Sequence, residues 1–219
     1  MKLLLKSNKR IMNYSVFAHQ RRIVEGIFRY YRFDGQEFLL DVGCGGGWFS
    51  RLFSKYAKLV LGVDIILDQN WRKVKSRNIQ FVIADACNLP FRNECFDIVF
   101  EKDTLHHIKN HERALKEIAR VTRRGGIIIL IEANRYNPIL YFHMTLMKHH
   151  EHFTKKYFEN LIASAFRKCC FTSIESHVYP IRSKFALKII HIMEDLLGKI
   201  PFFKDYLSYN IAIVKNEIE

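Results

Sequence analysis

The sequence predicts a single α/β domain built around a mostly parallel β-sheet, and three observations support this. Short apolar runs such as Leu59–Asp64 and Ile127–Ile131 have the length and continuity of strands that are buried on both faces. These runs alternate with segments whose apolar residues recur at helical spacing. A glycine cluster also joins one strand directly to a helix. At 219 residues, one domain is the simplest count.

The composition is that of a globular chain with a basic surface. Hydrophobic residues make up 49%, and 35 basic against 22 acidic residues give a net charge of +13. This charge is compatible with nucleic acid, an anionic membrane surface or an anionic substrate. The basic residues are spread along the whole chain, so a generic lysine-rich surface explains them better than a single polyanionic partner.

Membrane and secretion signals are not expected. The longest apolar runs are far shorter than the roughly 20 residues of a membrane helix. The basic start, Met1–Lys6, is not followed by an apolar stretch of useful length, so no signal peptide is predicted. The five cysteines are odd in number and form no C-x-x-C, which favours reduced thiols and argues against a cysteine metal site. A cytoplasmic location and no metal are therefore expected.

An amphipathic helix over residues 21–31 is expected before the first strand, since Ile23, Ile27 and Tyr31 recur at helical spacing. The chain then turns into a strand over 37–41. The glycine loop and a helix over 48–56 follow.

The glycine loop has the spacing Gly43-x-Gly45-x-Gly47, and Trp48 stands where the dinucleotide fingerprint needs a small residue. Asp41, at the start of the loop, would repel a phosphate but could help to hold an ammonium group. The loop therefore favours a cationic, nucleoside-containing cofactor over a pyrophosphate cofactor.

At this loop the sequence resembles the class I S-adenosylmethionine-dependent methyltransferases, whose first motif is D/E-x-G-x-G-x-G. Later segments are most similar to the small-molecule branch typified by the ubiquinone/menaquinone methyltransferases. The resemblance covers residues 38–134. It implies a Rossmann-like, doubly wound sheet of seven strands with an antiparallel last strand. It also implies S-adenosylmethionine as cofactor and S-adenosylhomocysteine as product. Cys44, inside the loop, is expected to contact the cofactor together with Asp41 and the three glycines.

The second and third strands each end in an acid. Asp64 closes the strand over 59–64, where this architecture places a partner for ribose hydroxyls. The alternative is that Asp64 caps a helix expected near 68–75. Ile65 follows Asp64 and is counted with the cofactor residues. After the strand over 79–84, the resemblance implies that Asp85 accepts from the adenine amine and that the Ala86 N–H meets a ring nitrogen.

The loop after the fourth strand (96–101) contains Lys102, whose backbone is expected to face the methionine part of the cofactor. His106 and His107 are candidate general bases, because an imidazole can take a proton near neutral pH. In an extended segment the two would point to opposite sides. Asp97, at the strand start, is expected to bond local backbone.

A helix over 111–124 is predicted to end at Gly125-Gly126, with Arg120, Arg123 and Arg124 in its last turns. A fifth strand over 127–132 follows.

Residues 135–219 are expected to form a substrate-side lid, later helices and the last strand, after an arm (1–32) and a cofactor-binding core (33–134). Thr154 is expected to cap a helix, with a strand over 172–179, an amphipathic helix over 183–197 and a strand over 206–215. Cys170-Phe171 is expected at a helix end. Tyr136, and by the resemblance Tyr14 and Phe17, are candidate substrate-binding residues. Packing on the domain surface is the alternative for the last two.

Two kinds of metal site are conceivable, and neither is favoured. Asp103, Glu132 and Asn134 offer oxygen ligands for Mg²⁺. Four histidines could bind a transition metal, although a solvated lid explains them better: His143, His149, His150 and His152.

The residues thus predict a methyltransferase, monomeric or homodimeric, acting on a small-molecule or lipid-like acceptor. The 183–197 helix permits contact with a membrane surface, although packing against the sheet explains its apolar face better. The alternatives are an RNA or protein methyltransferase, suggested by the charge, and a degenerate fold that acts as a binding subunit. The slot at Glu101–Thr104 lacks the proline and aromatic residue of adenine-specific nucleic-acid methyltransferases.

Overall fold

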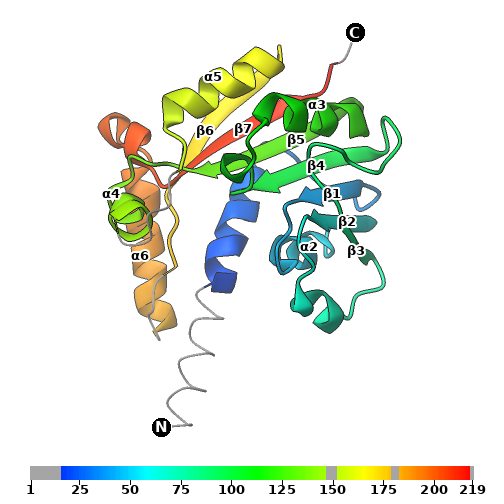
Figure 1. Cartoon of the computed structure of the whole chain (residues 1–219). Coiled ribbons are helices and arrows are strands. Elements are labelled where there is room, and N and C mark those ends of the chain that lie inside the picture. Colours follow the sequence, from blue (N-terminus) through cyan, green and yellow to red (C-terminus); the bar gives the residue numbers. More distant parts are fainter. Residues whose placement is uncertain (1–15, 147–151, 179–182, 218–219) are drawn as a thin grey trace.

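The computed structural model describes residues 16–146, 152–178 and 183–217, which fold around one seven-stranded sheet (Figure 1). The strands lie in the order β3-β2-β1-β4-β5-β7-β6. Their bounds are β1 (Phe38–Val42), β2 (Leu59–Asp64), β3 (Ile79–Ile83), β4 (Phe96–Lys102), β5 (Thr122–Ala133), β6 (Cys169–Ile174) and β7 (Tyr209–Lys215). Strands β1 to β5 are parallel to one another, and β7 is antiparallel to both β5 and β6. The predicted fold class is confirmed.

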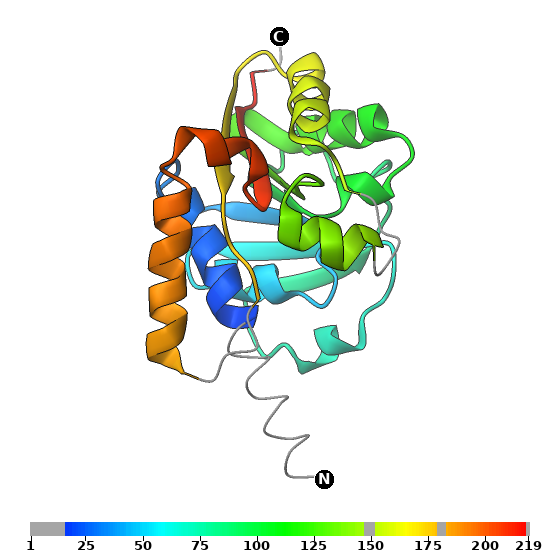
Figure 2. The same cartoon turned by 90° about the vertical axis from the view of Figure 1, so that its left-hand side faces the viewer.

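Helices cover both faces of the sheet (Figures 1 and 2). One core lies under α3 (His111–Val121) and α5 (Lys155–Ala165). The other lies under α2 (Trp48–Phe53) and an N-terminal helix that includes residues 16–27. In the N-terminal helix Ile23, Val24 and Ile27 are buried. This helix lies earlier in the chain than the predicted span of 21–31, because residues 28–30 form a turn.

The boundary between α3 and β5 differs from the prediction. The helix ends at Val121, and the Thr122 hydroxyl donates to the Ile118 carbonyl at 2.7 Å. Thr122 already pairs with Phe96 of β4, so Gly125 and Gly126 lie inside the strand and do not end the helix. Arg123, predicted to be helical, is therefore a strand residue that pairs with Asp97.

Asp97 has the structural role expected from the sequence. Its other carboxylate oxygen accepts from the Phe38 N–H at 2.8 Å, which links β4 to the start of β1.

Two further predicted segments are shifted. Between β2 and β3 the structure has a 3₁₀ turn, Gln69–Lys73, capped by Asp68. Strand β6 begins at Cys169, because that residue pairs with Val214 of β7. Cys170 and Phe171 are therefore strand residues and not a helix end.

Thr154 caps α5, as predicted, by accepting from the Tyr157 N–H. The segment after β5 forms α4 (Pro138–Leu140) and a π-helical turn, Tyr141–Leu146.

The helix α6 (Lys184–Leu197) forms as predicted, with Ser183 as its cap. The expectation that its apolar face packs against the sheet is wrong, because this face is open and Phe185 is 74% exposed. Polar contacts hold the helix instead: Arg22 of the N-terminal helix pairs with Glu194 and Asp195. None of the described helices is long and apolar enough to cross a bilayer.

Candidate active site

The three glycines of the loop after β1 all have a positive φ, of 69°, 49° and 73° for Gly43, Gly45 and Gly47. A side chain on Gly43 would lie 1.9 Å from Thr104 Oγ1, and one on Gly47 would lie 2.5 Å from Phe81. A side chain on Gly45 would meet nothing within 4 Å. Gly45 therefore presents open backbone to a ligand, whereas Gly43 and Gly47 allow close packing within the protein.

Asp41 and Cys44 lie beneath the loop. The buried Asp41 carboxyl accepts a hydrogen bond from Ser50 Oγ at 2.5 Å, which ties the loop to α2. Burial raises the pKa of Asp41 to about 7. Burial also raises the pKa of the Cys44 thiol, so this cysteine is an unreactive packing residue.

Asp64 stands at the tip of β2 beside the open side of the loop. Its two carboxylate oxygens accept from the Gly45 N–H at 2.8 Å and the Ile66 N–H at 3.0 Å. Each oxygen keeps lone pairs for further donors, such as ribose hydroxyls. Ile65, next in the chain, is 65% exposed and offers an apolar surface.

Trp71 lies on the other side of the loop. No motif in the sequence identified it as a site residue. Its indole N–H donates to the Gly45 carbonyl at 2.6 Å, and its ring stacks on Phe81 at 4.9 Å.

Asp85 and Ala86 follow β3 at the same sheet edge. Asp85 is exposed, and one of its oxygens accepts from the Cys87 N–H at 2.8 Å. The carboxyl ends of β1, β2 and β3 thus bring Gly45, Asp64 and Asp85 to one edge, where open α/β sheets bind ligands.

The loop after β4 joins this edge to a cavity. Thr104 Oγ1 lies 3.5 Å from the Gly43 carbonyl, and the neighbouring Asp103 accepts from the Ala133 N–H at 3.0 Å. The buried Lys102 ammonium pairs with Asp103 and lies 4.2 Å above the Tyr209 ring. Burial alone would lower the pKa of Lys102, but its ion pair with Asp103 raises it.

The segment with His106 and His107 is not extended, so the condition under which their side chains would point to opposite sides is not met. Glu101 accepts from the N–H groups of Thr104 and Leu105, and the chain turns into a short 3₁₀ helix, Leu105–His107. The two imidazole rings consequently lie 4.1 Å apart. His106 Nδ1 lies 2.6 Å from Glu132 Oε2, and its side chain is only 3% exposed.

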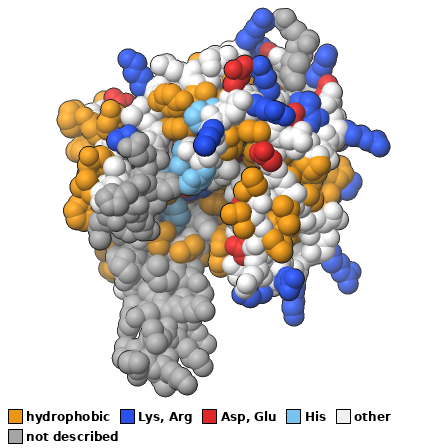
Figure 3. Space-filling model, viewed as in Figure 1, with side chains coloured by type: hydrophobic (Ala, Val, Ile, Leu, Met, Phe, Trp, Pro, Cys, Tyr) orange, Lys and Arg blue, Asp and Glu red, His pale blue; other side chains and the backbone are white. Residues whose placement is uncertain are grey.

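The cavity has a volume of about 730 Å³ and opens on the face in Figure 3, where histidine side chains gather. Its walls are mainly apolar. The described residues that line it are His19, Asp103, Ala133, Pro138, Ile139, Leu140, Phe142, His152, His177, Val178 and Tyr209.

Two of the cavity histidines are held by polar partners, one distant in sequence and one two residues away. His19 Nδ1 lies 2.9 Å from Ser176 Oγ, and His177 Nε2 lies 2.5 Å from Glu175 Oε1. Burial lowers the pKa of His19 to about 3, so this imidazole is neutral.

Among the candidate substrate residues, Phe17 and Tyr136 lie outside this cavity. Phe17 faces Lys55 and a separate hollow beside α6, and it is His19 of the same helix that reaches the cavity. Tyr136 is 57% exposed and is not among the described cavity-lining residues, nor are His106 and His107. Tyr14, His149 and His150 lie outside the described residues. No sequence motif marks His19 or His177, which come from segments far apart in the chain.

The residues that offer oxygen ligands for Mg²⁺ already have protein partners. The Asn134 amide oxygen accepts from the Tyr136 N–H at 3.1 Å, and Asp103 is paired with Lys102.

Comparisons with known proteins agree with this geometry. Residues 40–130 match the family described as a methyltransferase domain. A demethylmenaquinone methyltransferase from Staphylococcus saprophyticus is 37% identical over 103 residues, which are 44% of each chain. A ubiquinone biosynthesis O-methyltransferase from Coxiella burnetii is 31% identical over 102 residues, again 44% of each. The chain thus spans less than half the length of these curated relatives.

The fold is shared over a longer span. The structure of an S-adenosylmethionine-dependent methyltransferase from Thermotoga maritima superposes with a TM-score of 0.67 at 16% identity, and the match covers 97% of this chain and 96% of that one.

Proposed function

We propose that this chain, which carries a class I S-adenosylmethionine-dependent methyltransferase domain, transfers a methyl group to a small-molecule or lipid-like acceptor. The observation that carries the proposal is the cavity of about 730 Å³, which adjoins the glycine loop through Asp103 and Thr104. A cavity of this size with mainly apolar walls and a few convergent polar groups suits a small ligand.

The cofactor fits the residues at the sheet edge. The open backbone at Gly45 admits a ligand where a side chain would not, and Asp64 keeps lone pairs for two ribose hydroxyls. We assign the adenine to Asp85 and Ala86, with Ile65 against its ring, and the methionine part to the backbone at Lys102. When bound, the cofactor supplies an electrophilic methyl group.

Methyl transfer to oxygen requires a proton acceptor, and three histidines are candidates. His177 lines the cavity and is oriented by Glu175, the arrangement of a general base with its positioning carboxylate. We therefore place His177 first. His106 and His107 remain candidates on the adjoining loop.

The proposal is tested by supplying methyl-labelled S-adenosylmethionine to the purified protein with a cell extract. Label is then followed into organic-extractable, small aqueous, nucleic-acid and protein fractions. We expect label in one of the first two fractions. Label in RNA or protein would instead favour the class of substrate suggested by the +13 charge.

A cavity-filling variant ties the label to the cavity. Ile139→Trp should reduce acceptor labelling at least about tenfold and leave S-adenosylhomocysteine affinity unchanged, because Ile139 lines the cavity and not the glycine loop. Ile189→Trp, at a similarly exposed position on α6, is the matched control. Equal labelling by both variants would show that the acceptor binds elsewhere.

A further inference from the structure

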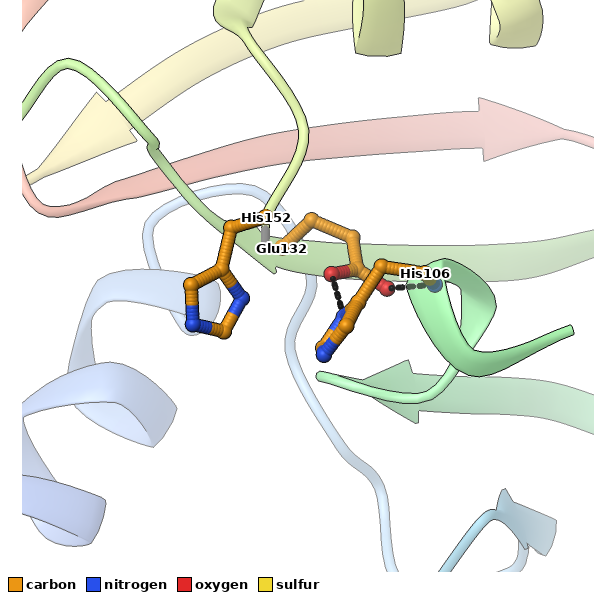
Figure 4. A group of neighbouring side chains, drawn as sticks. All are labelled: His106, Glu132 and His152. Carbon is orange, nitrogen blue, oxygen red and sulfur yellow. Dashed lines mark hydrogen bonds and ion pairs between the residues drawn. The ribbon is translucent and has the colours of Figure 1, made fainter. Parts of the chain in front are cut away.

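We propose that His106, Glu132 and His152 bind a divalent transition-metal ion at the wall of the acceptor cavity. Figure 4 shows the three side chains converging from the turn after β4, the end of β5 and the segment before α5. One possible ligand atom from each residue lies within 4.8 Å of the other two.

The spacing of the three groups requires only a side-chain adjustment to hold an ion. His106 Nδ1 and Glu132 Oε2 are 2.6 Å apart, and the rings of His106 and His152 are 4.6 Å apart at 66°. Bonds of roughly 2.1 Å to nitrogen and oxygen place the ligand atoms of a tetrahedral ion roughly 3.3 Å apart. Small rotations about the side-chain bonds cover the difference.

The surroundings of Glu132 favour a cation independently of this spacing. Glu132 and Glu101 are both fully buried, and they come from the neighbouring strands β5 and β4. A bound divalent ion would offset this concentration of buried acids.

Unsatisfied polar atoms lie in the same place. Asn210 pairs across the strands with Glu132 and is 2% exposed. Within the described part of the chain, neither polar atom of its amide has a hydrogen-bond partner, and the same holds for Glu101 Oε2. Buried polar atoms of this kind are commonly satisfied by an ion or a water molecule.

The ligand chemistry selects the class of metal. Two imidazoles and one carboxylate suit Zn²⁺, Fe²⁺ or Co²⁺, whereas Mg²⁺ and Ca²⁺ prefer oxygen ligands throughout. Three protein ligands also leave coordination positions for water or substrate.

His152 lines the acceptor cavity, so an open coordination position there could take an acceptor oxygen. The ion would lower the pKa of a bound hydroxyl, whose proton would pass to water. The oxygen–carbon bond would then form as the sulfur–carbon bond of the sulfonium breaks, releasing a neutral sulfide. This catalytic role rests on the proposed function, whereas metal binding does not.

Metal binding is tested on the full chain after treatment with a chelator, without any acceptor. Zn²⁺ is titrated by calorimetry and Co²⁺ by its visible absorption. We expect one site per chain, whose affinity falls at least on the order of 100-fold in Glu132→Gln and in His152→Gln. His191→Gln, on α6, is the matched control and should bind like the wild type.

Two results would overturn the proposal: no saturable site in the wild type, or equal affinity in the wild type and both ligand variants. Thermal unfolding checks that each variant is folded, and His152→Gln, in the segment before α5, is the variant that perturbs the sheet less. Affinity for S-adenosylhomocysteine is measured in parallel. A wild-type protein that binds the metal but not S-adenosylhomocysteine would count against the proposed function and leave the metal site standing.

Discussion

At the scale of single residues, the glycines of the loop lack side chains for different reasons. Gly43 and Gly47 are packed against Thr104 and Phe81, whereas Gly45 faces open space. The fold requires glycine at positions 43 and 47, whereas the missing side chain at Gly45 leaves space for a ligand. Gly125 in β5 has the same open surroundings and a φ of 74°, but it lies far from this loop in the sheet.

This difference gives a prediction with an internal control. Gly45→Ala and Gly125→Ala should each lower the free energy of unfolding by about 1 kcal/mol, because both put a side chain at a positive φ. Only Gly45→Ala should also weaken binding of S-adenosylhomocysteine, at least about tenfold. Calorimetric titration and denaturant unfolding measure the two effects. Equal cofactor affinity in both variants would show that Gly45 does not face the cofactor.

His19 is predicted to make the protein acid-sensitive. Burial and the nearby Lys102 lower its pKa from 6.5 to about 3 in the folded state. The unfolded chain therefore takes up the proton first, and stability falls as the pH drops below about 6.5. At pH 5 the loss from this residue is about 2 kcal/mol.

His19→Asn keeps a polar side chain and removes the titration. Denaturant unfolding at pH 7 and pH 5 should show a smaller drop for the variant than for the wild type. If the free energy of unfolding fell equally in the two proteins between pH 7 and pH 5, His19 would not be held neutral in the folded state.

The sequence revealed site residues that belong to contiguous motifs. Gly45, Asp64 and Asp85 each follow an apolar strand, so their place at the sheet edge could be predicted. His19 and His177 could not, since their surroundings depend on tertiary packing: His19 meets Ser176, 157 positions away. Trp71 was missed because nothing local shows that its indole reaches the Gly45 carbonyl.

At the scale of elements, the N-terminal helix is part of the core and also carries His19 to the cavity. Ile27→Ala should cost about 3 kcal/mol of unfolding free energy, because the side chain is fully buried against the sheet. Arg21→Ala, on the exposed side of the same helix, should cost less than about 0.5 kcal/mol. Urea denaturation measures both. A loss below about 1 kcal/mol in Ile27→Ala would mean that this helix is only loosely attached.

Periodicity identified the apolar faces of the helices but not what covers them. The apolar stripes of α3 and the N-terminal helix are buried, whereas that of α6 is open, and α6 makes ion pairs with Arg22. The ends of the helices were also less predictable, because they depend on contacts with residues distant in sequence. The end of α3 is set by the pairing of Thr122 with β4, which the local sequence does not contain.

At the scale of the whole molecule, the sheet topology determines where the site lies. Parallel strands β1 to β4 end at one edge, and the loop after β4 joins this edge to the cavity at the end of β5. Seven strands with an antiparallel last strand were expected from the resemblance, whose motifs occur in a fixed succession along the chain. The cavity did not, because its walls come from the N-terminal helix, α4 and the segments before α5 and α6.

The measurement that tests this account most directly is calorimetric titration of the protein with S-adenosylhomocysteine. We expect one site with a micromolar Kd. Asp64→Ala should weaken it by about 10- to 100-fold through loss of the charged hydrogen bonds, while Asp205→Ala, an exposed acid that pairs with Lys155, should not. Absence of binding, or the same affinity in Asp64→Ala as in the wild type, would contradict a cofactor site at the glycine loop.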